Sequence, residues 1–293
     1  MKIIVVENYE QLSNEAAKII INQLQKKPNS VMGLATGATP MGMYEALRKA
    51  YANGEVSFKD VTTFNLDEYC GIDPNHPQSY HYYMQQNLFN HIDVKPENVH
   101  LPSATSDWNS AAKSYNDLLK QTKIDLQVLG IGSNGHIGFN EPGTSFEQET
   151  FVVELAEKTR LDNQRFFNSL EEVPRFAITM GIKNIMQAKQ ILLLISGKNK
   201  AKTAKRLLEG KVGTDFPASV LHLHKSVTII LDEDAYPVLA KLKDKNGIPV
   251  LKQLITLKSN TKNTQPKHLG VHRVFNGSQK LIQVEFQTVV KFI

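Results

Sequence analysis

The sequence predicts an α/β fold in which a doubly wound, mainly parallel sheet carries helices on both faces. Short apolar runs typical of buried strands alternate along the chain with segments whose apolar residues recur at helical spacing. Several of the apolar runs end in loops rich in Gly, Thr, Asn and Asp. Because alternating strands and helices favour parallel βαβ units, we expect a Rossmann-like sheet with these loops along one rim.

Strands and helices alternate through the first half of the chain. The predicted strands are the apolar runs at residues 2–6, 31–34, 61–66, 99–101 and 126–131. Helices are predicted at residues 11–25, from Pro40 to Gly54, around 80–89, and at 107–119. Thr39 is placed to cap the second of these helices, and Asp107 or Ser106 the last.

The second half continues the alternation. Strands are predicted at residues 151–155, 177–180, 191–195 and 227–231. Between them we expect a helix at 159–167, a short helix that ends at Gln187, and a helix from the Gly197 loop to Leu208. Asp232 is placed to cap a last helix that reaches Leu242.

Charge divides the 293 residues into two parts. Nine Lys or Arg and two Asp or Glu follow Leu242, so the rest of the chain holds 25 basic and 27 acidic residues, a net charge of −2. We therefore divide the chain into a domain at 1–242 and a basic extension at 243–293. A body with this charge argues against nucleic-acid binding.

The sequence shows no evident targeting or membrane segment and no cysteine pattern typical of disulfides or metal sites. The chain begins with a strand-like segment, and no apolar run approaches the roughly 18 residues of a membrane helix. This predicts a cytoplasmic protein without a membrane partner. Cys70 is the only cysteine, which excludes an intrachain disulfide and a cysteine-rich metal site.

The loop Thr36-Gly37-Ala38-Thr39-Pro40 has the character of an anion cradle. It joins a predicted strand to a predicted helix, whose exposed N–H groups and dipole suit a phosphate. It lacks the Gly-Lys-Ser/Thr of a Walker loop and the G-x-G-x-x-G of a dinucleotide site. The alternative is a plain strand–helix turn.

Asp67 and Glu68 end an otherwise apolar strand. A partly buried carboxylate there can have its pKa raised toward neutrality and serve as a general base, with the second acid as a helper. The alternative is that one of the two caps the next turn.

The segment from Leu129 to Gly143 combines a strand end with five glycines, His136 and Glu141. Glycines at this density allow sharp bends and close approach to a ligand. We give a metal site little weight, because neither an H-E-x-x-H nor a zinc-deaminase pattern is present. The alternative is a structural histidine in a tight loop.

Together these segments resemble the glucosamine-6-phosphate deaminase family. The resemblance is carried, in order, by Leu34–Pro40, Thr63–Tyr69, His76–Tyr80, Gly130–Pro142 and Asn163–Phe167, and it covers about residues 1–242. It implies conversion of D-glucosamine 6-phosphate and water to D-fructose 6-phosphate and ammonia, in amino-sugar catabolism and without metal or organic cofactor. The only partner that the resemblance implies is the small-molecule substrate. It does not decide whether the protein is a monomer or a homo-oligomer.

The resemblance also implies the role of each site residue. His136 is the acid–base that opens the sugar ring, and Glu141 and Asn134 hold it. Asp67 moves the proton from C2 to C1, and Glu68 is a further active-site residue. The substrate phosphate would bind the backbone amides of the loop and two cations, the full set being Thr36, Gly37, Ala38, Thr39, Arg165 and Lys200.

Three features go beyond this assignment. The segment from about Leu155 to Pro174 resembles the mobile lid of the family. Members activated by N-acetylglucosamine 6-phosphate carry two basic residues where this chain has Phe151 and Val153, so we expect no such activation. The extension has two strand-like runs, Val250–Leu257 and Leu281–Phe292, separated by a loop at 259–267, and the family assigns them no role.

Two other functions deserve comparison. A 6-phosphogluconolactonase has a similar fold and Gly-His loop, but we would not expect its loop to end in Asn140-Glu141-Pro142 or the chain to carry Asp67-Glu68-Tyr69. A non-enzymatic sugar-phosphate sensor would need a DNA-binding helix-turn-helix, which the β-leaning extension does not suit.

Overall fold

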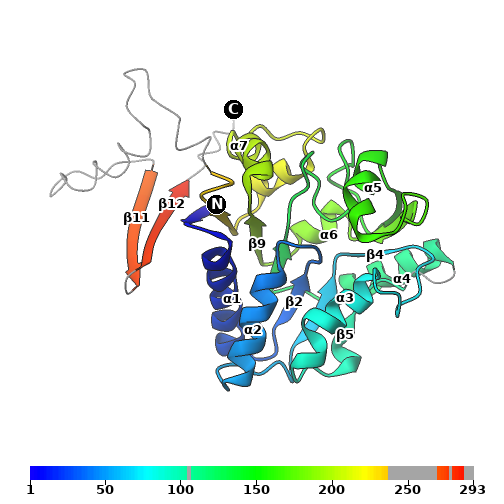
Figure 1. The fold of residues 1–293 in the computed structure, drawn as a ribbon, viewed down its shortest axis with the longest axis horizontal. Coiled ribbons are helices and arrows are strands. Elements are labelled where there is room, and N and C mark those ends of the chain that lie inside the picture. Colours follow the sequence, from blue (N-terminus) through cyan, green and yellow to red (C-terminus); the bar gives the residue numbers. More distant parts are fainter. Residues whose placement is uncertain (104–106, 237–268, 277–278, 287–293) are drawn as a thin grey trace.

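The larger of the two β-sheets contains strands from both ends and from the middle of the chain (Figure 1). The structure is a computed structural model and describes residues 1–103, 107–236, 269–276 and 279–286. In spatial order the parallel strands of this sheet are β1 (Lys2–Val6), β10 (Val227–Asp232), β9 (Gln190–Ile195), β6 (Leu126–Leu129), β2 (Val31–Leu34), β3 (Thr62–Asn65) and β5 (Val99–His100). The predicted parallel α/β sheet is confirmed.

Helices surround this sheet, as predicted. They are α1 (Tyr9–Lys26), α2 (Met41–Ala52), α3 (Tyr80–Asn87), α4 (Trp108–Lys120), α5 (Glu157–Asn163), α6 (Ile182–Met186) and α7 (Ala201–Leu208). Single turns of 3₁₀ helix cover Phe89–His91, Pro96–Asn98, Gln164–Phe166 and Lys198–Lys200, and a longer one covers Pro217–Leu223. None of the helices in the described ranges combines the length and apolar character needed to cross a bilayer.

Helix caps agree with the sequence in one case and differ in another. Asp107 caps α4 and accepts a hydrogen bond from the Ser110 N–H (3.2 Å), while Ser106 lies outside the described residues. At α2 the cap position belongs to Pro40, and no side chain bonds the first turn, so Thr39 as the cap was wrong. α2 begins at Met41, one residue after the predicted start, although Pro40 also has helical φ and ψ.

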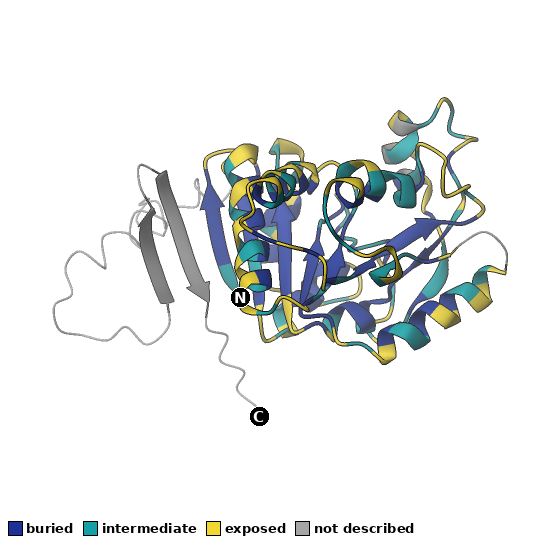
Figure 2. Ribbon diagram, turned by 90° about the horizontal axis from the view of Figure 1, so that it is seen from below, coloured by how far each residue is buried: buried dark blue, intermediate teal, exposed yellow. Residues whose placement is uncertain are grey.

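The core lies between the strands and the helices. Figure 2 shows the strands as the buried layer and the helices around them as half-exposed. In α1 the buried residues recur at helical spacing, namely Leu12, Ala16, Ile20 and Leu24. β9 and β10 are buried almost throughout, as expected of central parallel strands covered on both faces.

The smaller sheet corrects the prediction for two strands. It holds β4 (Asp67–Tyr69), β8 (Phe176–Thr179) and β7 (Phe151–Glu154) in the order β4-β8-β7, all antiparallel. The predicted strands at 151–155 and 177–180 exist, but they belong to this sheet and not to the parallel one. β7 is half-exposed, unlike a strand that is covered on both faces.

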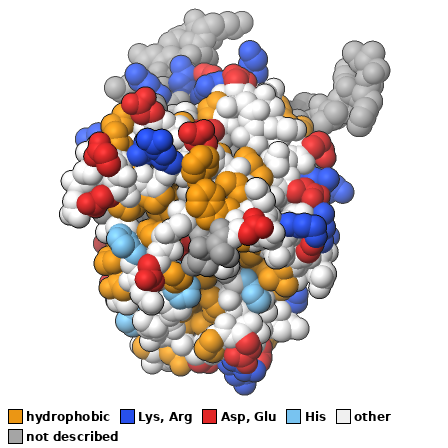
Figure 3. All heavy atoms as spheres, turned by 90° about the vertical axis from the view of Figure 1, so that its right-hand side faces the viewer, with side chains coloured by type: hydrophobic (Ala, Val, Ile, Leu, Met, Phe, Trp, Pro, Cys, Tyr) orange, Lys and Arg blue, Asp and Glu red, His pale blue; other side chains and the backbone are white. Residues whose placement is uncertain are grey.

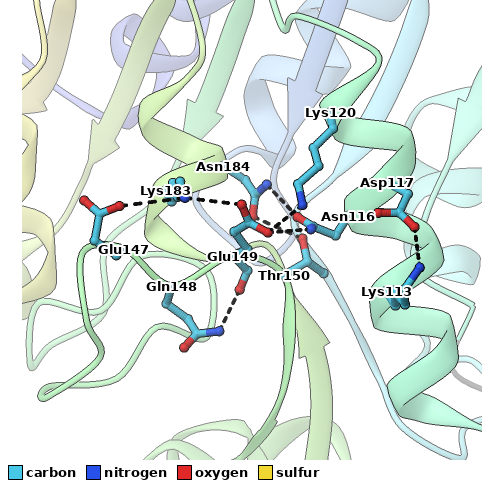
Figure 4. Close-up of polar contacts among 10 residues, drawn as sticks. All are labelled: Lys113, Asn116, Asp117, Lys120, Glu147, Gln148, Glu149, Thr150, Lys183 and Asn184. Atoms are coloured by element: carbon cyan, nitrogen blue, oxygen red, sulfur yellow. Dashed lines mark hydrogen bonds and ion pairs between the residues drawn. The ribbon is translucent and has the colours of Figure 1, made fainter.

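Ion pairs around Glu149 attach the smaller sheet to α4 and α6 (Figure 4). The Glu149 carboxylate contacts the ammonium groups of Lys120 (2.8 Å) and Lys183 (3.3 Å) and accepts a hydrogen bond from Asn116 Nδ2 (2.8 Å). The bond from Lys120, followed by that from Asn116, lowers the pKa of Glu149 to about 2. This carboxylate is therefore ionised over the ordinary pH range and fixes the residues that lead into β7.

The extension adds a hairpin to the edge of the larger sheet. β12 (Gln279–Phe286) pairs antiparallel with β1 and with β11 (Leu269–Asn276). β12 falls partly within the predicted run Leu281–Phe292, whereas β11 was not predicted. The run Val250–Leu257, the loop at 259–267 and the helix from Asp232 to Leu242, beyond its first residues, lie outside the described residues.

Candidate active site

The predicted site segments follow four neighbouring strands of the larger sheet. In spatial order β9, β6, β2 and β3 lie side by side and run parallel. Their carboxyl ends lead, respectively, to Lys200, to the loop of His136 and Glu141, to Thr36–Thr39, and to Asp67. Such an edge is where open α/β sheets bind ligands. The predicted convergence of these loops on one rim agrees with this strand order.

Asp67 is a buried carboxylate next to the glycine-rich loop. Asp67 is 6 % exposed, and no described residue donates a hydrogen bond to its carboxylate. A Cβ at Gly138 would be in ordinary contact with Asp67 Oδ2 (3.5 Å) and too close to Thr179 Oγ1 (2.9 Å), and the φ of +55° also favours glycine. Burial, followed by the nearby charge of Glu68, raises the pKa of Asp67 to about 8. A carboxylate so poorly solvated suits a general base.

Glu68 binds the backbone. Its carboxylate accepts hydrogen bonds from the N–H groups of Tyr69 (2.8 Å), Tyr80 (3.0 Å) and His81 (2.9 Å). Tyr80 and His81 open α3, so Glu68 satisfies two donors at the start of that helix. Burial raises the pKa of Glu68, and these hydrogen bonds oppose the rise. The structure thus favours the capping alternative for this residue, beside its effect on Asp67.

Asn134, His136 and Glu141 form one cluster in the glycine-rich loop. Asn134 Nδ2 donates to Glu141 Oε2 (2.7 Å), and Asn134 Oδ1 accepts from the backbone N–H of His136 (3.2 Å). His136 Nδ1 lies 3.6 Å from Glu141 Oε2, beyond hydrogen-bond distance. This nitrogen is buried and has no hydrogen-bond partner among the described residues. A small movement of Glu141 toward the ring would supply one.

Glu141 remains ionised despite its burial. Its other oxygen, Oε1, accepts a short hydrogen bond from the hydroxyl of Thr159. Burial raises the pKa of Glu141, but the contacts with His136, Thr159 and Asn134 outweigh it and lower the pKa to about 2. At neutral pH a negative charge therefore faces His136, where it can orient the ring and stabilise an imidazolium.

In the loop Thr36–Thr39, two carbonyl oxygens accept hydrogen bonds, and the amides donate to no described group. Tyrosine hydroxyls donate to the carbonyls of the loop and its approach, namely Tyr44 to Ala35 (2.6 Å), Tyr83 to Gly37 (2.7 Å) and Tyr9 to Ala38 (3.0 Å). No described group accepts a hydrogen bond from the N–H groups of residues 36–39. Gly37 and Ala38 are exposed. The loop can thus offer several donors to an anion.

Arg165 and Lys200 lie on 3₁₀ turns at different places. Lys200 ends the turn that follows β9 and precedes α7. Arg165 is exposed on the turn after α5, within the connection between β7 and β8. Both residues make contacts within the protein. Their assignment to the phosphate site stays a prediction.

Sequence reasoning missed the residues that support the site. Thr159, Asn163 and the three tyrosines act through contacts between distant parts of the chain, for which no local pattern exists. Among the described residues, no cluster of three or more His, Cys, Asp or Glu is arranged to hold a metal ion.

Comparison with known proteins assigns the chain to a family. A model of the family "Glucosamine-6-phosphate isomerases/6-phosphogluconolactonase" matches residues 7–230. A glucosamine-6-phosphate deaminase of Thermoanaerobacter sp. (strain X514) is 55 % identical over 237 residues, which are 80 % of this chain and 94 % of that protein. The deaminase of Clostridium botulinum (strain Alaska E43 / Type E3) is 53 % identical over 241 residues, 82 % of this chain and 97 % of the relative.

Solved structures agree with this assignment. A monomeric glucosamine-6-phosphate deaminase superposes with a TM-score of 0.79 at 48 % identity, covering 80 % of this chain and 98 % of that one. The 6-phosphogluconolactonase of Trypanosoma brucei shares the fold, with a TM-score of 0.68, 20 % identity, and coverage of 81 % and 98 %. The chain belongs to the family of glucosamine-6-phosphate isomerases and 6-phosphogluconolactonases, and within it to the glucosamine-6-phosphate deaminases.

Proposed function

We propose that this protein deaminates D-glucosamine 6-phosphate in the cytoplasm, with water as co-substrate and D-fructose 6-phosphate and ammonia as products. The buried Asp67 carboxylate, placed against the loop of His136 and Glu141, is the observation that carries the proposal. A base must remove the weakly acidic proton at C2, and a carboxylate without hydrogen-bond donors is the strongest one this rim offers.

Ring opening comes first and uses His136. The imidazole transfers a proton between the C1 hydroxyl and the ring oxygen, which breaks the C1–O5 bond and gives the open-chain aldehyde. The fixed charge of Glu141 supports the imidazolium that forms on the way, and Asn134 holds Glu141 in place.

Isomerisation and deamination follow at Asp67. Its carboxylate takes the C2 proton while the C1 oxygen gains a proton that the substrate ammonium gives up, and the C2–H electron pair forms the C1=C2 bond of an enolamine. Asp67 then returns its proton to C1, and the nitrogen lone pair forms the C2 iminium. Water adds to C2, the C–N bond breaks, and ammonia leaves the ketose. The substrate ammonium would favour ionisation of Asp67, whose pKa burial has raised to about 8.

The substrate phosphate binds at the neighbouring loop in this proposal. The free amides of Thr36, Gly37, Ala38 and Thr39 provide directed donors, and the positive end of α2 adds a favourable dipole. Arg165 and Lys200 supply the cationic charge. Glu68 acts on the reaction through Asp67, since its charge contributes to the raised pKa.

Replacement of Asp67 tests the base assignment. We expect Asp67→Asn to lower kcat by about 10²–10⁴-fold while substrate binding is retained. Coupled assays of ammonia and fructose 6-phosphate give the rate, and calorimetric titration gives the affinity. The lactone of 6-phosphogluconate serves as the alternative substrate. Undiminished deamination by Asp67→Asn would refute the role of Asp67, and turnover of the lactone alone would refute the function.

A further inference from the structure

The segment at 155–175 is the long connection of an antiparallel hairpin. β7 and β8 pair directly, with Glu154 opposite Phe176, and the connection between them carries α5 and Arg165. β8 also pairs with β4, so this connection is rooted in the same small sheet as Asp67. Arg160 closes it internally by donating to the carbonyls of Leu170 (2.7 Å) and Val173 (3.1 Å). These hydrogen bonds join the two parts of the connection that flank Arg165.

α5 is held to the protein by little apolar packing. Among its described side chains only Thr159 is buried, at 4 % exposure, whereas Leu161 is 50 % exposed. Figure 3 views the molecule from the side on which α5 lies in Figure 1, and apolar side chains are visible at that surface. Because the one buried side chain among the described residues of α5 is polar, the position of the helix depends on the partner of that side chain.

The partners of α5 are site residues. Thr159 donates to Glu141 Oε1, and Asn163 Nδ2 donates to the Tyr69 hydroxyl (3.1 Å), two residues after Asp67. Thr159 and Asn163 are four residues apart, so they share one face of the helix. One face of α5 thus contacts both the strand of Asp67 and the carboxylate that faces His136.

We propose that Thr159 is a positioning residue, which fixes the Glu141 carboxylate against His136 only while α5 is docked. Glu141 Oε1 is bound by Thr159 and Oε2 by Asn134, so the direction in which the carboxylate faces His136 depends on both. This inference rests on the proposed function for its chemistry. It makes docking of α5, and with it the placement of Arg165, a condition for an aligned His136.

Three variants separate the hydroxyl from its surroundings. Thr159→Val keeps the shape and removes the donor, while Thr159→Ser keeps the donor. The matched control is Thr150→Val, which removes another buried threonine hydroxyl, bonded to Asn184 (3.2 Å) in the cluster of Figure 4. We expect Thr159→Val to lower kcat about tenfold or more, with a smaller change in KM, and Thr159→Ser to restore kcat. Equal kcat in Thr159→Val and wild type, or a serine variant as slow as the valine variant, would overturn the proposal.

A second measurement does not require turnover. His136 is the described titratable group that faces Glu141. The lowered pKa of Glu141 contributes stability that is present above its ordinary value of 4.5 and is lost as the pH falls toward about 2. The Tm difference between wild type and Thr159→Val should therefore shrink from pH 7 to pH 3, and that of Thr150→Val should not. A constant difference for Thr159→Val overturns the contact, whereas a wild type that releases no ammonia overturns only the proposed function.

Discussion

Asp67 and Glu68 are consecutive residues of β4, yet their carboxylates have opposite surroundings. Glu68 accepts three backbone N–H groups, and Asp67 accepts none from the described residues. Both residues are buried away from water. The three N–H groups replace water around the Glu68 carboxylate, and the Asp67 carboxylate has no such replacement among the described residues. The charge of Glu68 adds to the effect of burial on Asp67. One carboxylate thus stabilises a helix start and makes its neighbour more basic.

Asp67 should make the protein less stable as the pH rises. Its pKa in the folded state is about 8, against an ordinary 3.8, so its contribution to stability is full below 3.8 and is lost as the pH rises to about 8. Asp67→Asn does not titrate and should gain in free energy of unfolding relative to wild type between pH 5 and pH 9. Urea unfolding at several pH values measures this, and parallel curves for the two proteins would contradict it.

Glu68→Gln should destabilise the fold. It replaces the carboxyl group that accepts three backbone N–H groups by an amide, at an expected cost of about 1–3 kcal/mol. For a domain of this size each 1 kcal/mol corresponds to a Tm change of about 2–4 °C. Glu10→Gln, in the exposed first turn of α1, is the control and should change the stability by less than about 0.5 kcal/mol. Equal thermal unfolding of both variants would show that the three bonds contribute nothing.

N-acetylglucosamine 6-phosphate should not activate the enzyme. Phe151 and Val153 on β7 carry no charge that could bind its phosphate. Substrate saturation curves with and without this ligand should coincide, apart from competition at the active site. A clear fall in the half-saturating substrate concentration would contradict the prediction.

Removal of residues 243–293 should preserve catalysis and weaken the fold. We propose that residues 1–242 form the catalytic domain, because the candidate site lies beyond the carboxyl ends of β9, β6, β2 and β3, away from β12. Deletion exposes the edge of β1 that β12 covers, and exposed edges favour self-association. We expect an unchanged kcat with a lower Tm or a larger mass by light scattering. A strong loss of kcat in a soluble, folded truncation would place part of the site in the extension.

The sequence predicted those parts of the fold that local patterns determine. Apolar runs located the central strands, and the loops that follow them carry Asp67, His136 and Glu141 at one rim. The pairing of β4, β8 and β7 was not predictable, because strand partners distant in sequence are chosen by packing. For the same reason the residues around Thr159 in the sequence did not predict its contact with Glu141.

The helix caps depend partly on contacts that local sequence patterns do not show. Thr39 and Asp107 are both ordinary cap residues, yet only Asp107 bonds the first turn of its helix. At α2 the preceding loop is held by the hydroxyls of Tyr9 and Tyr83 from other helices, and the cap position belongs to Pro40. Glu68, in contrast, lies on β4 and accepts hydrogen bonds from the first N–H groups of α3. The spacing of these residues along the chain does not reveal this contact.

The tyrosine hydroxyls around the Thr36–Thr39 loop shift evolutionary constraint away from the loop itself. In the proposed phosphate site the donors are backbone amides, so a change of the Ala38 side chain would not remove a donor. Gly37 cannot drift freely, because its φ of +95° suits few other residues. Tyr9, Tyr44 and Tyr83 come from α1, α2 and α3, so the proposed phosphate site predicts selection on three side chains that bind the carbonyls of the loop and its approach.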